Sequence, residues 1–449
     1  MKIIIIGGVA AGAKAAAKSK RLLPDAEVHI YTQDTCVSYS SCGLPYYIAG
    51  DFEDWHKLIV RTIEEFEKSG VHIHTLNRVT KILPADKKIL VKNLETNECF
   101  FVEYDRLIIA TGSFPYKPEI KNNNLKNIFT LRTLQDGINI REAMEKSNHI
   151  TIIGGGYIAV ELIEAFVKNG KNVTVIERSA FMLSVYDEEI SSLIQTFILE
   201  NSNDRVKILN EDSVSEFVGE DKVNGIVTQK GFGFETDMVI ISAGVRPAVD
   251  IAVSAGIELG ITGAIKVNSR MQTNIPDIYA CGDCVEKINM ISHTPVWLPL
   301  GSTANKEGRV AAINACGGVE DFEGILNSAV LRYHALNISM TGLTEKAAQK
   351  LGFDTVSVVI TKRDKAGYMP EVQNVTLKLV ADRRTHRVLG AQAIGCGDAD
   401  KRVNTVSVGL LSSMRVEDLL DVDLTYAPPF STSIDILISA ARILKSKLS

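Results

Sequence analysis

The hydrophobic pattern near the N-terminus alternates between short apolar runs and a glycine turn. Residues 2–6 are β-branched and lead into a turn that starts at Gly7. An Ala- and Lys-rich helical stretch then reaches about residue 23, before an apolar run at 28–31. This order predicts a βαβ unit that binds a dinucleotide, because glycines let the backbone approach a pyrophosphate and the helix N-terminus attracts its charge. Val9 stands where the usual pattern has its middle glycine.

The same pattern recurs in the second quarter of the chain. An apolar run at 150–153 leads into Gly154 and Gly156, and a helical stretch precedes a second apolar run at 172–176. Ala159 takes the third small-residue position of the turn, which the usual fingerprint permits. Two such units in one chain predict two dinucleotides.

Glu177 and Arg178 bear on which nicotinamide nucleotide the second unit takes. An acid at the end of the second strand bonds the ribose 2′-hydroxyl of NADH and repels the 2′-phosphate of NADPH. Glu177 stands at that position and favours NADH. The adjacent Arg178 would attract a 2′-phosphate, so NADPH stays an alternative.

Three further apolar runs end in small residues or acids, where the ligands of open α/β sheets bind. They are residues 104–109 before Ala110-Thr111-Gly112, residues 237–242 before Gly244, and residues 278–280 before Gly282 and Asp283. Cys281 and Cys284 form a Cys-x-x-Cys pair in the last of these, but no second Cys or His pair has zinc-like spacing. We therefore expect no metal.

The pattern changes after about residue 321. The glycine turns stop, and apolar segments at 329–333, 355–360, 374–380 and 388–394 precede a helix from about residue 400. Such segments predict antiparallel strands in a separate α+β domain. The predicted fold class is therefore α/β, with two Rossmann-like units and a C-terminal α+β domain.

Composition narrows the class of partner. With 449 residues, the chain is long enough for two or three domains. A net charge of −5 gives no general attraction to nucleic acid, and no apolar segment is long enough to span a membrane. Residues 1–8 lack the long apolar region of a signal peptide. Seven scattered cysteines suit a reducing cytoplasm better than a disulfide framework, so we expect free thiols and a small-molecule partner.

Cys42 is the candidate redox centre. It lies in the stretch Ser38-Tyr39-Ser40-Ser41-Cys42-Gly43-Leu44-Pro45, between the first βαβ unit and a turn. A cysteine reacts as its thiolate, which a helix N-terminus or a nearby cation favours. Residues alone do not separate this role from that of a small buried apolar side chain.

The glycine turn at Gly7, the Ala110–Gly112 turn, the Gly154–Ala159 fingerprint and the Gly282-Asp283 pair together resemble the two-dinucleotide flavoprotein disulfide reductase superfamily. The likeness covers essentially the whole chain. It implies FAD in a discontinuous domain of residues 1–112 and 245–321, NAD(P)H in residues 113–244, and a homodimerisation domain in residues 322–449.

The resemblance implies a role for Asp283 at the FAD ribitol and for Tyr157 near the nicotinamide. The full set of expected cofactor-binding residues is Gly7, Gly8, Ala10, Ala11, Gly12, Thr32, Gln33, Ser41, Ala110, Thr111, Gly112, Gly154, Gly156, Tyr157, Ile158, Ala159, Glu161, Glu177, Arg178, Gly244, Gly282 and Asp283. Thr32 and Gln33 depart from the family pattern, since a glutamate that binds the FAD ribose is usual at position 32.

The Cys42 stretch decides the branch of the superfamily. Val37 stands where glutathione-reductase-like members have the first cysteine of a Cys-x4-Cys pair, and Cys36 has the wrong spacing. The stretch is similar to the single-cysteine branch of coenzyme A disulfide reductases, persulfide reductases and NADH oxidases or peroxidases. Ala10 occupies the place of the histidine that oxidase and peroxidase members use, which favours the coenzyme A disulfide reductases.

Two pairs of residues extend the likeness to coenzyme A disulfide reductases. Tyr368 and Tyr426 match two tyrosines that approach the cysteine from the opposite subunit in that family, although Met369 replaces a neighbouring tyrosine. Lys20 and Arg21 stand where basic residues hold the nucleotide of coenzyme A. The resemblance thus implies coenzyme A as a further ligand.

The expected function is electron transfer from NAD(P)H through FAD to Cys42, and on to a small disulfide or persulfide, most of all coenzyme A disulfide. One alternative is an NADH oxidase or peroxidase that cycles Cys42 through sulfenic acid. Another is a flavoprotein that passes electrons to a protein partner. Because no rhodanese-like segment follows Ser449, we do not expect a persulfide reductase of the fused type.

Overall fold

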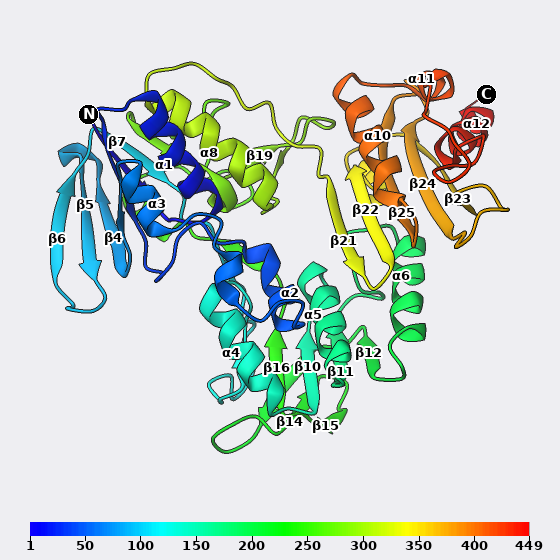
Figure 1. Ribbon diagram of the computed structural model, residues 1–449, viewed down its shortest axis with the longest axis horizontal. Helices are drawn as coiled ribbons and strands as arrows, with labels where there is room; N and C mark the ends of the chain where they lie inside the picture. The colour runs from blue at the N-terminus through cyan, green and yellow to red at the C-terminus, as the bar shows by residue number, and fades with distance from the viewer. Residues whose placement is uncertain (449) are drawn as a thin grey trace.

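Three domains make up the structure, a computed structural model that describes residues 1–448. Figure 1 shows the N-terminal sheet on the left, a second sheet below the centre and the C-terminal domain on the right. The predicted fold class is confirmed, since two parallel five-stranded sheets precede an antiparallel one. The residue limits given above for each domain stay predictions.

The first sheet is parallel and gathers strands from distant parts of the sequence. Its order is β18 (Ile278–Ala280), β7 (Arg106–Ile109), β1 (Lys2–Ile6), β2 (Glu27–Tyr31) and β3 (Val71–His74). Alternate residues of β1 face opposite sides of the sheet. Ile3 and Ile5 pack on the helix side, and Ile4 and Ile6 pack on the other.

Each face of the first sheet is covered by a different layer. Helices α1 (Ala10–Leu22) and α8 (Gly301–Ala315) pack together on one face. An antiparallel meander of β4 (Asn77–Leu83), β5 (Lys88–Asn93) and β6 (Cys99–Glu103) covers the other. Burial on both faces explains why β1 is apolar at four consecutive positions.

The second sheet repeats this design. Its parallel order is β12 (Val206–Asn210), β11 (Asn172–Glu177), β10 (His149–Ile153), β16 (Met238–Ile241) and β9 (Ile128–Phe129). The layer on one face is formed by helices α4 (Leu134–Glu145), α5 (Tyr157–Lys168) and α6 (Glu188–Glu200). The layer on the other is formed by the meander β13 (Val214–Val218), β14 (Gly225–Thr228) and β15 (Gly233–Glu235).

The C-terminal domain is an antiparallel sheet with helices against it. The strand order is β21 (Ala329–Tyr333), β22 (Leu336–Gly342), β25 (Val388–Gly395), β24 (Asn374–Asp382) and β23 (Thr355–Arg363). The helices are α9 (Glu345–Lys350), α10 (Ala399–Leu411), α11 (Val416–Asp421) and α12 (Ile436–Leu448). The sequence did not predict the two three-stranded meanders of the first two domains. It also did not predict β22 and α9 of the C-terminal domain.

Shorter elements lie between these strands and helices. Two of them, β8 (Ser113–Pro115) and β17 (Val245–Pro247), pair with each other where the chain enters and leaves the second sheet. The others are η1 (Ser41–Gly43), α2 (Leu44–Ile48), η2 (Trp55–Leu58), α3 (Ile63–Lys68), η3 (Pro84–Asp86), α7 (Asp250–Ser254), η4 (Gly282–Cys284), β19 (Lys287–Ile288) and β20 (Pro295–Val296).

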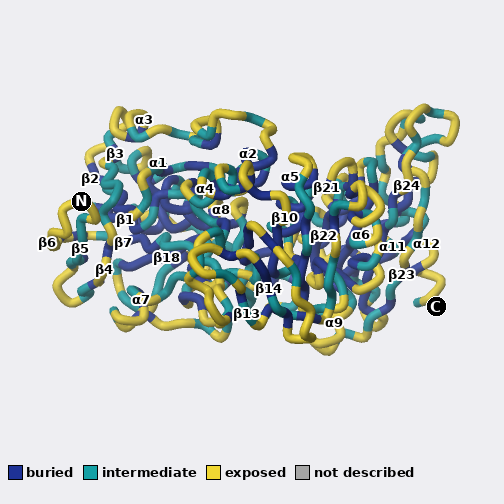
Figure 2. Tube along the Cα trace, turned by 90° about the horizontal axis from the view of Figure 1, so that it is seen from below, coloured by how far each residue is buried: buried dark blue, intermediate teal, exposed yellow. Residues whose placement is uncertain are grey.

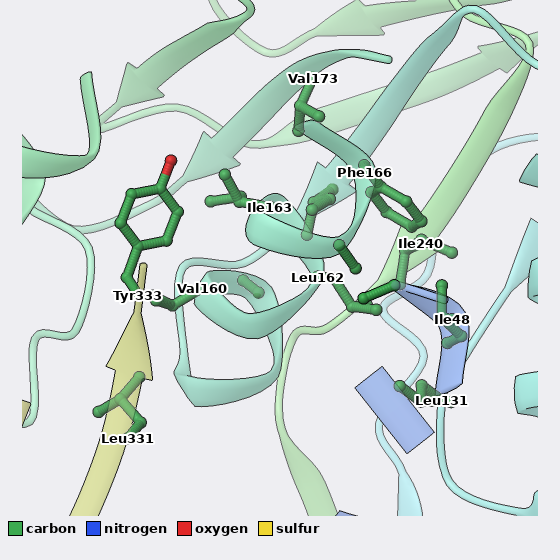
Figure 3. Packing of buried hydrophobic residues seen from close by; sticks show 14 of the residues in the cluster. Ile48, Leu131, Val160, Leu162, Ile163, Phe166, Val173, Ile240, Leu331 and Tyr333 are labelled. Atoms are coloured by element: carbon green, nitrogen blue, oxygen red, sulfur yellow. The ribbon is translucent and has the colours of Figure 1, made fainter. Parts of the chain in front are cut away.

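One apolar cluster joins parts of all three domains around α5. Tyr333 of β21 is fully buried, and Figure 3 shows its ring near Val160 and Ile163 of α5. Ile48 of α2 packs in the same cluster from another side of the helix. The helix that follows the second glycine turn is therefore held between the segment after Cys42 and the C-terminal sheet.

Burial follows the sheets. Figure 2 shows the strands of the sheet interiors as buried chain, with β6 and many connecting loops exposed. None of the helices within residues 1–448 has the length and apolar character that a membrane span requires.

Candidate active site

Cys42 lies in η1, directly before α2, and its thiol is free and exposed. Its Sγ atom faces the start of α8, since a Cβ built on Gly301 would lie 4.0 Å from it. Helix α8 begins without a side-chain cap and without an acid in its first turn. Its free N–H groups and dipole therefore favour an anion beside Cys42.

Other effects on the Cys42 thiol act in the opposite direction. Although the residue is accessible at the surface, the protein atoms packed around the thiol keep water away and raise its pKa, and the negative charge of Glu161 adds to this. A hydrogen bond from Ser41 and the charge of Arg132 lower the pKa, but by less. The polypeptide by itself therefore favours the protonated thiol at neutral pH.

Helix α5 carries four predicted site residues, of which Tyr157 and Glu161 lie one turn apart. Burial, and then the charge of Glu164, raises the pKa of Glu161 to about 7. The Tyr157 hydroxyl lies 3.6 Å from Sδ of Met340 in the C-terminal domain, and its ring packs edge-on against Tyr186. Ile158 and Ala159 complete the first turn of this helix.

The carboxyl ends of β1, β7 and β18 meet at one edge of the first sheet, because the three strands are neighbours. They are followed by Gly7, by Ala110, Thr111 and Gly112, and by Gly282 and Asp283. The order of strands in the sheet therefore brings together three of the turns that the sequence analysis identified as candidate ligand sites.

The first of these turns fits a pyrophosphate. Gly7 has φ +101°, and a Cβ on Gly12 would collide with the Gly7 carbonyl oxygen. Ala10, Ala11 and Gly12 form the first turn of α1, which has neither a side-chain cap nor an acid. By contrast, α4 starts with a complete capping box. The uncapped N–H groups of α1 match what FAD needs at its pyrophosphate.

Asp283 is held by a residue that sequence reasoning missed. Its Oδ2 atom accepts a hydrogen bond from Nη2 of Arg132 at 2.9 Å and lies 3.4 Å from Oγ of Ser113. Its backbone carbonyl accepts from Nε1 of Trp297 at 2.8 Å. Arg132 comes from the start of the second sheet's domain, so no local signal could have linked it to Asp283.

A buried ion pair holds the turn beside Asp283. Oε2 of Glu307 accepts from the Gly282 N–H at 2.8 Å, and Nζ of Lys287 donates to the Gly282 carbonyl at 3.0 Å. Glu307 and Lys287 are 3.5 Å apart, with side chains 0% and 1% exposed. Burial raises the pKa of Glu307 to about 7 even though Lys287 lowers it.

The second glycine turn fits a nicotinamide nucleotide. Gly154 has φ +97°, and neither Gly156 nor Gly244 would bring an added Cβ within 4 Å of another group. The ends of β10, β11 and β16 are neighbours, which sets Glu177 beside this open turn. Arg178 is exposed next to it.

Most of the remaining predicted residues make contacts within their own segment of the chain. Thr32 is buried, and its Oγ1 accepts from the Asp34 N–H, while Gln33 is exposed. Nζ of Lys20 donates to the Ala26 carbonyl at 2.9 Å, and Nε of Arg21 donates to a carbonyl of its own helix. Gly8 lies against Val37.

Tyr368 and Tyr426 belong to the C-terminal domain and are 76% and 52% exposed. Figure 1 shows β23 and α12, which flank their two segments, at the far right, away from α2. Within residues 1–448, no group of three or more His, Cys, Asp or Glu side chains could hold a metal ion.

Glycine turns of this kind after β1 and β10 define a protein with two dinucleotide-binding units, and Cys42 gives it an exposed thiol. Residues 1–308 match the pyridine nucleotide-disulphide oxidoreductase family, and residues 328–437 match the dimerisation domain of that family. The chain belongs to this family and is an NAD(P)H-dependent disulfide or persulfide oxidoreductase, similar to coenzyme A disulfide reductases. The family implies FAD and NAD(P)H as cofactors.

Three known proteins illustrate the likeness. The NAD(P)H coenzyme A polysulfide/persulfide reductase of Pyrococcus horikoshii is 36% identical, over 99% of this chain and 98% of its own. An NADH oxidase of Methanocaldococcus jannaschii is 31% identical over the full length of both chains. The crystal structure of reduced Bacillus anthracis CoADR-RHD superposes with a TM-score of 0.96 at 33% identity, covering 100% of this chain and 80% of that one.

Proposed function

We propose that this protein reduces coenzyme A disulfide with electrons from NADH, and that Cys42 is its redox centre. The observation that carries the proposal is the position of the exposed Cys42 thiol, beside the uncapped start of α8 and within electrostatic reach of Asp283. A disulfide reductase of this kind exchanges electrons through a cysteine sulfur, and Cys42 is the cysteine that the sequence singles out and that lies exposed beside α8.

Different residues of the chain would bind FAD and NADH. The α1 N-terminus would hold the FAD pyrophosphate, and Asp283 the ribitol hydroxyls. The open turn at Gly156 and the carboxylate of Glu177 would hold NADH. Bound FAD would supply the two-electron chemistry that links NADH to a sulfur atom.

The sulfur chemistry on Cys42 is a disulfide exchange. Two electrons break a mixed disulfide between Cys42 and coenzyme A, which gives the Cys42 thiolate and, with one proton, free coenzyme A. The thiolate then attacks coenzyme A disulfide, forms the mixed disulfide again and releases a second coenzyme A thiolate, which takes up a proton. In total, NADH, one proton and one coenzyme A disulfide give NAD⁺ and two molecules of coenzyme A.

Tyr368 and Tyr426 would act from a second subunit. Both phenols are exposed, and their domain matches a dimerisation domain. In a homodimer they would approach the partner's thiol and protonate or orient the leaving thiolate. A tyrosine hydroxyl suits this task because it donates a proton without carrying a charge at neutral pH.

A second candidate function is that of an NADH oxidase, in which Cys42 cycles through sulfenic acid. The M. jannaschii relative, named as an NADH oxidase, favours it. Ala10 stands against it, since alanine offers no hydrogen bond to a sulfenate. Rates of NADH consumption with oxygen, peroxide and coenzyme A disulfide separate the two functions.

Cys42→Ser tests the proposal. We expect the variant to keep FAD and to undergo flavin bleaching by NADH, yet to reduce no coenzyme A disulfide. Cys36→Ser is the matched control and should retain turnover, because Cys36 packs at the edge of an apolar cluster. Undiminished turnover in Cys42→Ser would remove Cys42 from the mechanism. Mass spectrometry of the unreduced protein should find a coenzyme A adduct on Cys42, whereas an added oxygen would support the oxidase.

A further inference from the structure

Arg402 of α10 is a buried cation in the C-terminal domain, with its side chain 4% exposed. Its guanidinium donates two hydrogen bonds to the carboxylate of Asp435. Nη2 lies 2.9 Å and Nε 3.2 Å from the same Oδ2 atom. A buried pair of this kind is held in one geometry, because the planar guanidinium fork fixes the direction of each bond.

The same guanidinium also binds two backbone carbonyls. Nη1 donates to the carbonyl of Asp398 at 2.9 Å, and Nη2 donates to the carbonyl of Asp364 at 3.3 Å. Arg402 therefore ties α10 to the start of one segment, at Asp364, and to the end of another, at Asp435.

The first segment is the β23–β24 loop, residues 364–373, which carries Tyr368. Its two ends are closed on each other. The Asp364 N–H donates to the Gln373 carbonyl at 2.8 Å, and the Gln373 N–H donates to Oδ1 of Asp364 at 2.9 Å. Arg402 thus binds this loop where its two ends meet. Tyr368, away from these ends, is exposed.

The second segment joins α11 to α12, covers residues 422–435 and carries Tyr426. Asp435, at its end, also accepts from Oγ of Ser431 at 3.0 Å. The two segments meet directly, because the Ala366 N–H donates to the Pro428 carbonyl at 3.2 Å. A cavity of about 540 Å³ lies between them, lined among others by Asp364, Asp398 and Phe430.

We propose that Arg402 is a positioning residue that places Tyr368 and Tyr426 together, so that both hydroxyls reach one Cys42 of the partner subunit. Neither tyrosine is fixed by burial in its own chain, so the placement of each depends on how its segment is anchored. One guanidinium anchors both segments. The inference rests on the proposed role of the two tyrosines.

Arg402→Lys is the informative substitution. Lysine keeps the charge and can still pair with Asp435, but a single ammonium cannot reproduce the fork that also holds Asp364 and Asp398. The holoenzyme should show an unchanged rate of flavin bleaching by NADH. Reoxidation by coenzyme A disulfide should slow at least about tenfold, since a misplacement of about 1 Å can lower a rate on the order of a hundredfold.

A thermodynamic cycle separates positioning from general stability. In a Tyr368→Phe/Tyr426→Phe enzyme, adding Arg402→Lys should slow reoxidation by less than about twofold, because the groups that it positions are already gone. An equal slowing with and without the tyrosines would overturn the positioning role. An undiminished reoxidation rate in the double Phe enzyme would instead overturn the proposed role of the tyrosines.

Hydrogen exchange gives a readout that does not depend on activity. Arg402→Lys should speed amide exchange in residues 364–373 and 422–435 more than in β24 and β25. Unchanged exchange in both segments would contradict the inference.

Lys401→Met, an exposed change on the same helix, should match the wild type in exchange and in both rates. If Arg402→Lys does not fold, Asp435→Asn should give the same pattern more weakly.

Discussion

Oε2 of Glu177 accepts a hydrogen bond from the Gly155 N–H at 2.6 Å, and so joins the end of β11 to the glycine turn that follows β10. Its other oxygen accepts from the Ser179 N–H at 2.7 Å. The carboxylate therefore shapes the turn, and in the proposed function it also binds a ribose hydroxyl of NADH. Support of the turn and binding of the ribose can be separated by experiment, because only binding of the ribose should differ between NADH and NADPH.

Glu177→Ala should lower kcat/KM for NADH about tenfold or more, which corresponds to the loss of about 1.4 kcal/mol. The loss with NADPH should be smaller, since removal of the negative charge relieves its repulsion of the 2′-phosphate. Steady-state rates with both nucleotides give the ratio. Glu177→Gln is the matched variant: its amide oxygen can still accept from the Gly155 N–H, but the charge is gone, so the ratio of NADH to NADPH activity should change as in Glu177→Ala with a smaller overall loss. Equal losses with both nucleotides in Glu177→Ala, together with no change of the ratio in Glu177→Gln, would limit Glu177 to a structural role.

The Arg132–Asp283 pair predicts an effect on FAD binding. Asp283→Ala removes a carboxylate at the edge where three strands end and leaves Arg132 without its partner. We expect the dissociation constant of FAD to rise about tenfold or more, from the loss of one charge-assisted hydrogen bond. Flavin fluorescence during FAD titration measures it. Asp321→Ala, an exposed change in the same part of the chain, should leave FAD binding unchanged, and equal binding in both variants would contradict the prediction.

Three stacked histidines on β2 and β3 predict a loss of stability in acid. Burial lowers the pKa of His29 to about 4, and the charges of His74, His72 and Lys2 add to this, while Glu27 acts against it. The unfolded value is about 6.5, so folding favours the neutral imidazole. This contribution is fully present above pH 6.5 and is lost as the pH falls toward 4, by at most about 3 kcal/mol.

The thermal unfolding midpoint should therefore fall between pH 6.5 and 4 in the wild type, and fall less steeply in His29→Asn. His293→Asn is the control, because His293 is exposed and lies outside this cluster, so its profile should match that of the wild type. Parallel profiles for the wild type and His29→Asn would show that the acid sensitivity comes from elsewhere.

The meeting of the candidate site's turns at one sheet edge could be predicted, because each turn is local in sequence. Gly7, Gly154 and Asp283 each lie within a few residues of a strand end, and a parallel sheet brings neighbouring strand ends to one edge. The fold class followed from the same repeated unit. Thr32 stands where the family usually has a glutamate; its side chain is buried and accepts from the Asp34 N–H, and its role at FAD stays a prediction.

Other parts could not be predicted, because they depend on contacts between distant segments. Arg132 reaches Asp283 across 151 positions. Arg402 reaches Asp435 across 33 positions, and a lone arginine on a helix has no sequence signal that distinguishes it from a surface residue. The strand β22 was missed because it mixes polar residues with apolar ones, yet it is buried on both sides in the sheet.

Glu161 and Cys42 predict how the reactivity of the thiol depends on pH. The negative charge of Glu161 raises the pKa of Cys42, second only to burial. Glu161→Gln removes that charge, so the midpoint for Cys42 alkylation by iodoacetamide should move to lower pH. Mass spectrometry of the Cys42 peptide distinguishes this thiol from the exposed Cys99.

Glu164→Gln is the control that sharpens this prediction. Glu164 raises the pKa of Glu161, which stands at about 7. At the higher pH where the Cys42 thiol titrates, Glu161 is already ionised with or without Glu164. The Glu164→Gln variant should therefore alkylate at Cys42 with the wild-type midpoint. A downward shift in Glu164→Gln equal to that in Glu161→Gln would contradict a specific effect of Glu161, and would point to the summed negative charge of α5 as the cause.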